Sequence, residues 1–345
     1  MSQFEKISIY VPDYIENILA KDAQLFEVFK TGKREINKNR FLGMLISGYY
    51  YKYTEECGQR KKKLEQVINS CGTQISSKQR AELCEQINSN ILMPQLPKRR
   101  NAEYKKLSLK PTAVTETIIS TIYSELGMND SLSQYFCRML MSYCSKPLFE
   151  RERIIFSDNY EFFEQACKDG ALVSFSLIWR PEYIYTAFPY DIATSHEEMM
   201  NYVLCQTRNT ETNDPQASVF RLSRIKNPCM SGKTDSLSDI VVSRLERMKK
   251  YAPQYPINND DEICVKLNDQ GEILYNKMYY SRPPYERLEH KEDGHYYFFK
   301  CSGNQVLFYF QRFGWGNAEI IFPNYLREKM MNLHKSAFEI YLNQS

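Results

Sequence analysis

The chain contains one short segment that resembles the end of a phosphate-binding loop. Residues 231–234 read Ser-Gly-Lys-Thr, and in such loops backbone N–H groups cradle phosphate while the lysine reaches its outer oxygens. The complete motif needs a glycine five residues before Gly232, and Asn227 stands there. We therefore do not expect nucleotide hydrolysis at this segment.

Two further spacings could serve catalysis, and both are weak. His196 and Glu197 open the pattern of a zinc-binding helix, but Met200 stands where the second histidine would be. Arg327 and His334 have the Arg-x6-His spacing of a ribonuclease motif, but one short pair of this kind arises easily by chance. The chain has 4 histidines, and no metal or general-base constellation presents itself. We predict that the protein is not an enzyme and needs no metal or cofactor.

The elements near the N-terminus follow the order strand, helix, helix. Residues 6–11 alternate polar and apolar side chains, the period of a half-buried strand. Pro12 ends the strand, and Asp13 with Glu16 predicts an N-cap and capping box. Asn37 is the expected N-cap of the second helix. The apolar positions at helical spacing are Ile15, Ile18, Leu19, Leu25 or Phe26, and Phe29, and then Phe41, Leu42, Leu45, Ile46, Tyr49 and Tyr53.

The same order returns about a hundred residues later. Residues 106–111 match residues 6–12 in pattern, one residue shorter, and Gly127 and Ser131 would close one helix and cap the next. The apolar positions of this copy are Ile118, Ile119, Ile122 and Leu126, and then Tyr135, Phe136, Met139, Leu140 and Tyr143. One strand with two helices cannot satisfy its backbone edges alone, so we expect the two strands to pair into an antiparallel ribbon over four helices.

Residues 6–53 resemble a ribbon-helix-helix fold, and residues 104–146 resemble a second copy. In that family the ribbon enters a nucleic-acid groove, and the start of the second helix holds phosphate through backbone N–H groups and the helix dipole. The resemblance and the alternation together imply these nucleic-acid contacts: Lys6, Ser8, Tyr10, Lys38, Asn39, Arg40, Lys106, Ser108 and Lys110.

The second copy departs from the first at its helix start, which reads Leu-Ser-Gln at residues 132–134 and carries no cation. Symmetric, operator-like DNA binding is therefore less expected. The alternative is a module that only packs or dimerises, with Lys6 and Lys110 as solvated strand residues. The basic runs at residues 60–63, before a helix, and 98–100, in a linker, would either add salt-sensitive phosphate contacts or be solvated.

Short strand-like segments in the middle of the chain favour a small β-barrel or sandwich. They span residues 171–179, 184–189, 202–206 and 218–222. The patterns at residues 188–192, 201–204 and 220–225 resemble the WYL domain, an Sm-like barrel of prokaryotic regulators. Only Tyr202 is kept of the Trp-Tyr-Leu motif that names the family.

The WYL resemblance implies a basic and aromatic pocket that binds nucleic acid or a nucleotide-like ligand. Matching positions implicate Tyr190, Tyr202, Arg221 and Arg224. Arg180 and Arg208 are added from charge alone. Guanidinium groups hold phosphate bidentately and tyrosines stack on bases. The alternative is that Tyr202 is a core residue and that Arg224 binds a carboxylate within the barrel.

The last third of the chain predicts an α+β region with a helix at residues 237–248. Strands are expected at residues 262–267, 273–278, 295–301 and 306–310, the last two joined by a hairpin turn at residues 302–304. The pattern of residues 313–328, leading into a terminal helix, resembles the α/β extension that often follows WYL domains. Such extensions commonly mediate dimerisation, so the resemblance implies a homodimer.

The charge of the chain is unevenly distributed. Residues 1–150 carry 22 Lys and Arg against 16 Asp and Glu, although the net charge of the whole chain is only +3. A basic front half suits a polyanionic partner. The 10 cysteines form no CxxC pair, the start of the chain resembles no signal peptide, and the longest apolar run, residues 171–179, is too short for a bilayer. We expect a cytoplasmic protein with no membrane association.

We therefore predict an α+β multidomain chain: tandem ribbon-helix-helix units at residues 1–150, a WYL barrel at 151–232 and its α/β extension at 233–345. This arrangement resembles the accessory proteins of type VI-D CRISPR systems. The resemblance implies a non-catalytic single-stranded RNA binder that stimulates the RNA-guided effector ribonuclease. One alternative is a transcriptional regulator that binds duplex DNA and senses a nucleotide-like ligand. Another is a protein-interaction scaffold.

Overall fold

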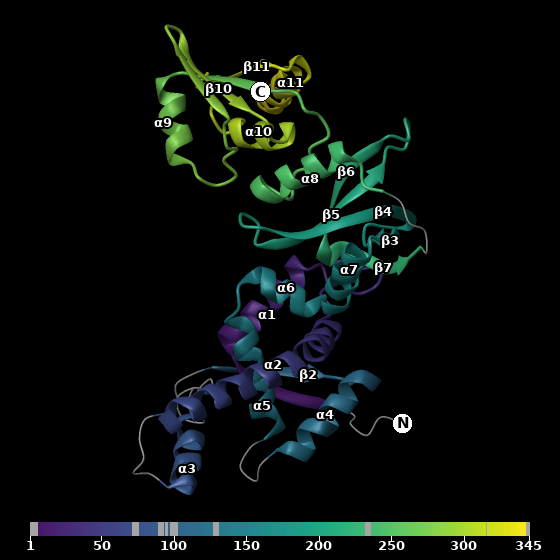
Figure 1. Ribbon diagram of the computed structural model, residues 1–345, viewed down its shortest axis with the longest axis vertical. Helices are drawn as coiled ribbons and strands as arrows, with labels where there is room; N and C mark the ends of the chain where they lie inside the picture. The colour runs from purple at the N-terminus through teal and green to yellow at the C-terminus, as the bar shows by residue number, and fades with distance from the viewer. Residues whose placement is uncertain are drawn as a thin grey trace. The chain divides into compact units, whose positions relative to one another are not determined.

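The computed structural model describes residues 6–70, 76–88, 93, 96, 103–126, 131–231, 236–314 and 316–342. It is mixed helix and sheet, as predicted (Figure 1). Contacts divide it into two compact units, Met1–Tyr160 and Glu161–Ser345. The expected helix end at Gly127, the basic run at residues 98–100 and residues 232–234 of the Ser-Gly-Lys-Thr segment lie outside the described residues. In the part of the chain described, no helix combines the length and apolar character needed to cross a membrane.

Unit 1 is built around a two-stranded antiparallel ribbon. Strand β1 (Ile7–Pro12) pairs with β2 (Tyr104–Leu109), and Ser8 lies opposite Ser108. The apolar residues of the alternation face inward: Ile9 and Leu109 are at most 1% exposed. The pairing of the two copies within one chain is therefore confirmed.

Unit 1 contains the helices α1 (Asp13–Leu25), α2 (Lys38–Ser70), α3 (Ser77–Ile87), α4 (Ala113–Glu125), α5 (Leu132–Cys144) and α6 (Leu148–Ile155). Helices α1, α2 and α5 pack on the ribbon, and α3, α4 and α6 pack on α2. The predicted apolar positions of the second helix in each copy, from Phe41 and Phe136 onward, are buried on α2 and α5. The basic run at residues 60–63 lies inside α2, not ahead of a helix, because α2 continues without a break to Ser70.

Two of the three predicted helix caps are present. Ser131 forms a capping box with Gln134, and the Asn37 side chain accepts a hydrogen bond from the Arg40 N–H at 3.0 Å. The prediction at Asp13 was wrong. Asp13 is the first residue of α1, Pro12 holds the cap position without a side-chain bond, and Glu16 pairs with a lysine instead.

A buried polar cluster joins the two copies. Asp22 of α1, which is 1% exposed, accepts a 2.8 Å hydrogen bond from the Tyr143 hydroxyl of α5. Arg151 of α6 donates to the other carboxylate oxygen of Asp22 at 3.0 Å. A buried carboxylate needs such partners, so this cluster fixes how α1, α5 and α6 pack.

Unit 2 begins within α7 (Ser157–Asp169), which is followed by a five-stranded antiparallel sheet. The order β6-β5-β4-β3-β7 comprises β3 (Val173–Leu177), β4 (Arg180–Ser195), β5 (Met200–Arg208), β6 (Pro215–Arg221) and β7 (Ile225–Met230). Strand β4 pairs with both β3 and β5: Ala187 lies opposite a residue of β3, and Phe188 lies opposite a residue of β5.

The sheet must curl, because its two edge strands follow each other in the chain. A single 3-10 turn (Leu222–Arg224) leads from β6 to β7. Three residues of 3-10 helix span roughly 6 Å, whereas four strand spacings of a flat sheet measure about 19 Å. The sheet is therefore strongly curled, as in a small barrel. Helix α8 (Asp239–Tyr251) packs against β4, β5 and β6 through Val241 and Leu245 (Figure 1).

The C-terminal part of unit 2 has a four-stranded antiparallel sheet in the order β11-β8-β10-β9. Its elements are β8 (Ile263–Leu267), α9 (Asp269–Lys277), β9 (Arg287–Lys291), β10 (Gly294–Phe299), α10 (Gly303–Phe310), β11 (Ala318–Phe322) and α11 (Asn324–Leu342). Aromatic and aliphatic side chains of both helices and sheet, such as Tyr275, Phe299 and Phe310, form one core.

Two predicted strands of this region are helices. Residues 273–278 lie largely in α9, which begins where the Asn268 side chain caps the Gly271 N–H at 2.7 Å. Residues 306–310 lie in α10, and Ser302 is its N-cap rather than part of a hairpin turn. A short apolar run fits a buried helix as well as a buried strand, so periodicity alone could not separate them.

Candidate nucleic-acid interface

The outward face of the ribbon carries the six side chains that alternation predicted. Tyr10 lies opposite Lys106, and Ser8 lies opposite Ser108. Lys6 and Lys110 stand just beyond the paired residues and are exposed. Three lysines, one tyrosine that is 40% exposed and two hydroxyl groups therefore share one solvent face. This composition suits contacts to phosphate and to base edges.

The start of α2 was predicted to hold phosphate, and the structure gives two of its side chains internal partners. Lys38 forms a 2.8 Å ion pair with Glu16. The Asn39 side chain accepts from the backbone N–H of Lys110 at 2.6 Å and donates to its carbonyl oxygen at 3.2 Å. Asn39 therefore ties α2 to the end of the ribbon, and its amide is not available to phosphate in this arrangement.

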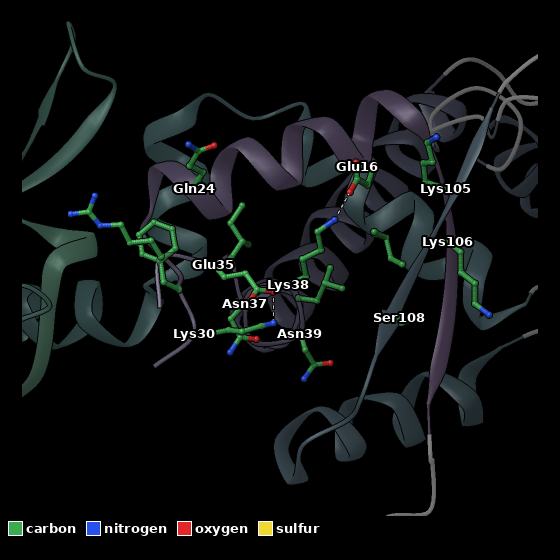
Figure 2. A pocket seen from close by; sticks show the side chains of 15 residues that line it. Glu16, Gln24, Lys30, Glu35, Asn37, Lys38, Asn39, Lys105, Lys106 and Ser108 are labelled. Carbon is green, nitrogen blue, oxygen red and sulfur yellow. Dashed lines mark hydrogen bonds and ion pairs between the residues drawn. The ribbon is translucent and has the colours of Figure 1, made fainter. Parts of the chain in front are cut away.

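Beside the ribbon lies a cleft of about 1150 Å³, which we call the basic cleft (Figure 2). Its walls come from α1, the loop before α2, the start of α2 and strand β2. The lining residues are Glu16, Gln24, Phe29, Lys30, Arg34, Glu35, Ile36, Asn37, Lys38, Asn39, Leu42, Lys105, Lys106, Leu107 and Ser108. Four predicted contacts are thus brought together: Lys38, Asn39, Lys106 and Ser108.

The charge of the basic cleft is positive, since five lining side chains are cationic and two are acidic. Both acids are already engaged: Glu16 with Lys38, and Glu35 with Lys30 at 2.5 Å, as Figure 2 shows. Lys105 lies 3.6 Å from Asp13. Arg34 and Lys106 have no acidic partner among the residues that the structure describes. These two cations are the best placed to meet an incoming phosphate.

The loop that supplies part of this charge was not among the predicted contacts. Phe29 and Ile36 form an isolated antiparallel bridge that closes the loop, and Gly32 turns it with a φ of +69°. A glycine suits that backbone conformation because it has no Cβ. The signal was present in the sequence as the cations Lys30, Lys33 and Arg34 around a glycine, but their position beside β2 follows only from the fold.

The residues predicted to bind on the barrel differ in exposure: Tyr202 is buried, whereas Arg180 and Arg208 are exposed. Tyr202, which we expected to stack on a base, is 7% exposed, because β5 is buried along most of its length, and its hydroxyl donates to Glu198. Arg221 lies directly opposite Tyr202 on β6, so the structure does bring these two residues together. An Arg221 side-chain nitrogen lies 3.2 Å from the sulfur of Met200.

The other barrel candidates are scattered. The Tyr190 hydroxyl donates to Glu246 of α8, and this hydrogen bond raises the pKa of the tyrosine. Arg208 is exposed and donates to the carbonyl oxygen of Asn213 at 3.2 Å. Arg224 lies in the 3-10 turn and is half-buried.

Arg180 lies near two exposed aromatic residues, which was not predicted from the sequence. It begins β4 directly after a tight turn and is exposed. Trp179 directly before it and Tyr183 three residues after it are 55% and 45% exposed. An exposed guanidinium group with two exposed aromatic rings is a combination that can stack on unpaired bases.

The catalytic spacings do not gain support from the structure. Arg327 forms a 2.7 Å ion pair with Glu319. Glu197 accepts hydrogen bonds from Gln254 at 2.8 Å and Ser281 at 2.9 Å. These side chains have structural partners.

No family model matches the chain, and no curated protein sequence matches it. Among solved structures, the crystal structure of a CRISPR Cas-related protein matches with a TM-score of 0.68, covering 99% of this chain and 95% of that chain at 18% identity. The two chains share a fold. Proteasome accessory factor B/C of Arthrobacter aurescens matches with a TM-score of 0.25, covering 65% of this chain and 35% of that chain at 14% identity. A score this low does not show a common fold.

Proposed function

We propose that this chain is a non-catalytic accessory protein of a type VI-D CRISPR system, which binds single-stranded RNA and stimulates the RNA-guided effector ribonuclease. The observation that carries the proposal is the basic cleft next to the ribbon, in a chain that shares its fold with a CRISPR Cas-related protein.

The size and charge of the basic cleft favour a polymer over a small molecule. At about 1150 Å³ the cleft exceeds the range of roughly 300–1000 Å³ that is usual for small ligands. Arg34 and Lys106, which have no acidic partner among the described residues, lie on two different walls, one on the loop and one on β2. A phosphate backbone that runs between these walls would meet both cations, and its bases could stack on exposed rings such as Tyr10.

A reconstituted cleavage assay tests the accessory role. A type VI-D effector loaded with its guide RNA is mixed with a limiting amount of target RNA, with and without this chain. We expect the chain to increase the cleavage rate and to cut no RNA by itself. An unchanged rate, with the chain in excess and correctly folded, would contradict the accessory role.

One observation favours a second function, binding of duplex DNA. Ser8 and Ser108 face each other at the centre of a two-stranded ribbon, flanked by Tyr10 and Lys106. A ribbon of this width fits the major groove of B-DNA, where hydroxyl and ammonium groups can read base edges. The helix start of the second copy carries no cation, so the two copies would make unequal contacts to the DNA phosphates.

We also propose that the chain forms a homodimer through α11. Met331, Phe338 and Tyr341 recur at helical spacing on this helix and are 61%, 62% and 77% exposed. An exposed apolar stripe of this kind is typical of an interface, and a second α11 would cover it.

A further inference from the structure

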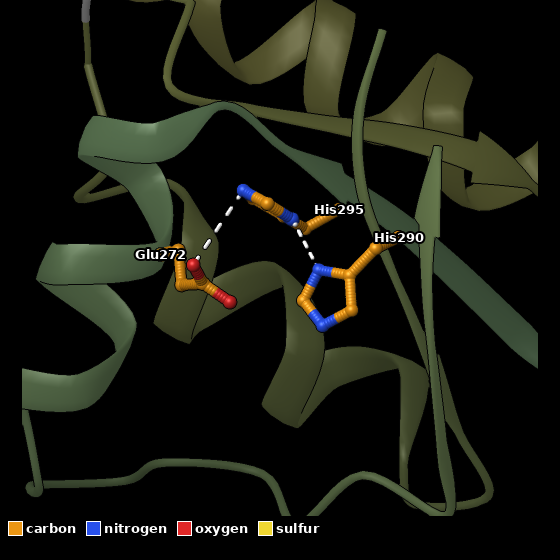
Figure 3. A group of neighbouring side chains, drawn as sticks. All are labelled: Glu272, His290 and His295. Carbon is orange, nitrogen blue, oxygen red and sulfur yellow. Dashed lines mark hydrogen bonds and ion pairs between the residues drawn. The ribbon is translucent and has the colours of Figure 1, made fainter. Parts of the chain in front are cut away.

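Two histidines of the four-stranded sheet face each other across the hairpin of β9 and β10. His290 and His295 lie directly opposite in the register, and their Nδ1 atoms are 2.6 Å apart. Side chains directly opposite on an antiparallel pair project to the same face of the sheet. Helix α9 packs on this face and contributes Glu272 to the same group, as Figure 3 shows.

The acidic side chains converge on the second nitrogen of His295. Its Nε2 atom lies 3.5 Å from a carboxylate oxygen of Glu272 and 3.1 Å from Asp269. The hydroxyl of Tyr297, a buried residue, donates to the other oxygen of Glu272 at 2.9 Å. This hydrogen bond orients Glu272 with one oxygen toward the histidine. Such an outer partner is what metal-binding carboxylates commonly have.

The group can hold a single metal ion once the ring of His290 turns. One ligand atom from each of Glu272, His290 and His295 lies within 4.8 Å of the others. One ion takes one nitrogen of each imidazole, and His295 would use Nε2, which faces the two carboxylates. Two nitrogens bound tetrahedrally to zinc at ~2.1 Å are about 3.4 Å apart, so the His290 ring would turn from its present contact with Nδ1 of His295 toward the ion. His290 is exposed, so nothing in its packing prevents this rotation.

The surrounding charges also favour a cation on this face. Asp269 and Glu272 bring two negative charges to the first turn of α9. Lys266 and Lys291 approach the ring of Tyr296 instead, at 5.7 Å and 4.2 Å from its centre. Because Tyr296 lies between His295 and Tyr297 in the strand, it projects to the opposite face. These lysines therefore do not neutralise the two carboxylates.

We propose that His290, His295 and Glu272, with Asp269 as a fourth ligand, bind one Zn²⁺ ion that fastens α9 to the hairpin. Mixed imidazole and carboxylate ligands suit zinc, whereas magnesium and calcium take oxygen ligands. The sites discussed for nucleic acid share no residue with this cluster, so the inference does not rest on the proposed function. Without an ion, the same atoms would be joined by hydrogen bonds alone.

The test uses the full chain, stripped of metal with a chelator and kept reduced, and titrated with Co²⁺ and then Zn²⁺. We expect one Co²⁺ per chain, with visible absorption bands but no thiolate-to-cobalt charge-transfer band, and displacement by Zn²⁺. His290→Gln and His295→Gln should each weaken binding by at least about tenfold. His334→Gln changes a histidine of α11 outside the cluster and should leave binding unchanged.

His290→Gln alters an exposed side chain, so the variant is expected to fold, and circular dichroism checks this. Three results would overturn the proposal: no Co²⁺ binding by the full chain, a thiolate charge-transfer band, or equal binding by the parent and both cluster variants. A hydrogen-bonded cluster without metal would give the first of these.

Discussion

Asn39, the second residue of α2, binds both backbone groups of Lys110, the residue that follows β2. The second copy repeats this contact. Ser133, the second residue of α5, accepts a 3.0 Å hydrogen bond from the N–H of Tyr10 on β1. Tyr10 and Lys110 hold the same place in the two strand patterns, so each copy uses the start of its second helix to bind the strand of the other. The two copies are thus interlocked, and helix starts that suggested phosphate binding stabilise the ribbon.

The Asn39 contact predicts a stability effect. Asn39→Ala should lower the free energy of unfolding by about 1–2 kcal/mol, because two backbone groups of Lys110 lose their partner. Asn39→Asp keeps the acceptor and loses the donor, so its effect should be smaller. Urea denaturation of the full chain measures both. If Asn39→Ala left stability unchanged and abolished RNA binding, Asn39 would be a phosphate ligand after all.

The basic cleft predicts a specific loss of RNA affinity. Replacing Arg34 and Lys106 together by Ala should weaken binding of single-stranded RNA roughly tenfold at physiological salt, because two phosphate contacts are removed. The slope of log affinity against log salt should fall by about 1.4, since each phosphate contact on a single strand contributes ~0.7.

Lys277→Ala is the matched control for the cleft variant, because Lys277 is an exposed lysine at the end of α9 and does not line the cleft. Fluorescence anisotropy at several salt concentrations compares the variants. Equal affinity and slope for the parent and the cleft variant would place the RNA site elsewhere.

A pH effect is expected in unit 2. Hydrogen bonds from Arg244 and Arg247 of α8 lower the pKa of Asp260 below its usual 3.8. A carboxyl whose pKa is lower in the folded state stabilises the fold above its unfolded pKa, and this stabilisation is lost as the pH falls through the folded pKa.

Asp260→Asn removes this contribution. Asp260 is 53% exposed, so solvent screening limits the effect to about 1 kcal/mol or less at neutral pH. The difference from the parent should shrink as the pH falls below about 4. Thermal unfolding across this range measures the difference, with Asp261→Asn as the neighbouring control. A difference that stays constant with pH would show that the ion pairs do not cause it.

The stripe on α11 predicts how the dimer is disrupted. Phe338→Asp should convert the chain to a monomer, because it buries a charge in the proposed contact with a second α11. Ile340 is similarly exposed, at 60%, but lies about 160° away around the helix. Ile340→Asp should therefore leave the dimer intact. Light scattering after size exclusion gives the masses. A parent chain that stays monomeric at all concentrations would refute the homodimer.

The ribbon could be predicted from the sequence because it depends on local alternation. Residues 6–11 and 106–111 alternate polar and apolar side chains, and that period alone sets which residues face inward. The pairing partner also followed, since the second copy was visible in the chain. The caps at Asn37 and Ser131 were correct for the same reason: each depends on the backbone N–H of the residue three positions later.

The helices α9 and α10 could not be predicted in this way. Each combines a short apolar run with aromatic residues that also suit strands, and each begins at a cap, Asn268 or Ser302, that resembles a turn residue. What decides their structure is packing around Tyr275 and Phe310 in the shared core. That contact joins residues more than thirty positions apart and leaves no local signal.

The candidate sites show the same division. The positions of Lys106 and Ser108 could be predicted from the alternation of the strand. The position of Arg34 in the basic cleft could not, because it depends on how its loop folds beside β2. His290 and His295 are five residues apart in a spacing that matches no metal motif, and the register of their hairpin brings them together.

The central claim, that this chain binds single-stranded RNA, is tested most directly by binding at physiological salt. Labelled single-stranded RNA and duplex DNA of equal length are titrated with the full chain and with the variant that lacks Arg34 and Lys106. We predict tighter binding of the RNA by the parent chain and a loss of that binding in the variant. A preference for duplex DNA, or binding of neither, would contradict it.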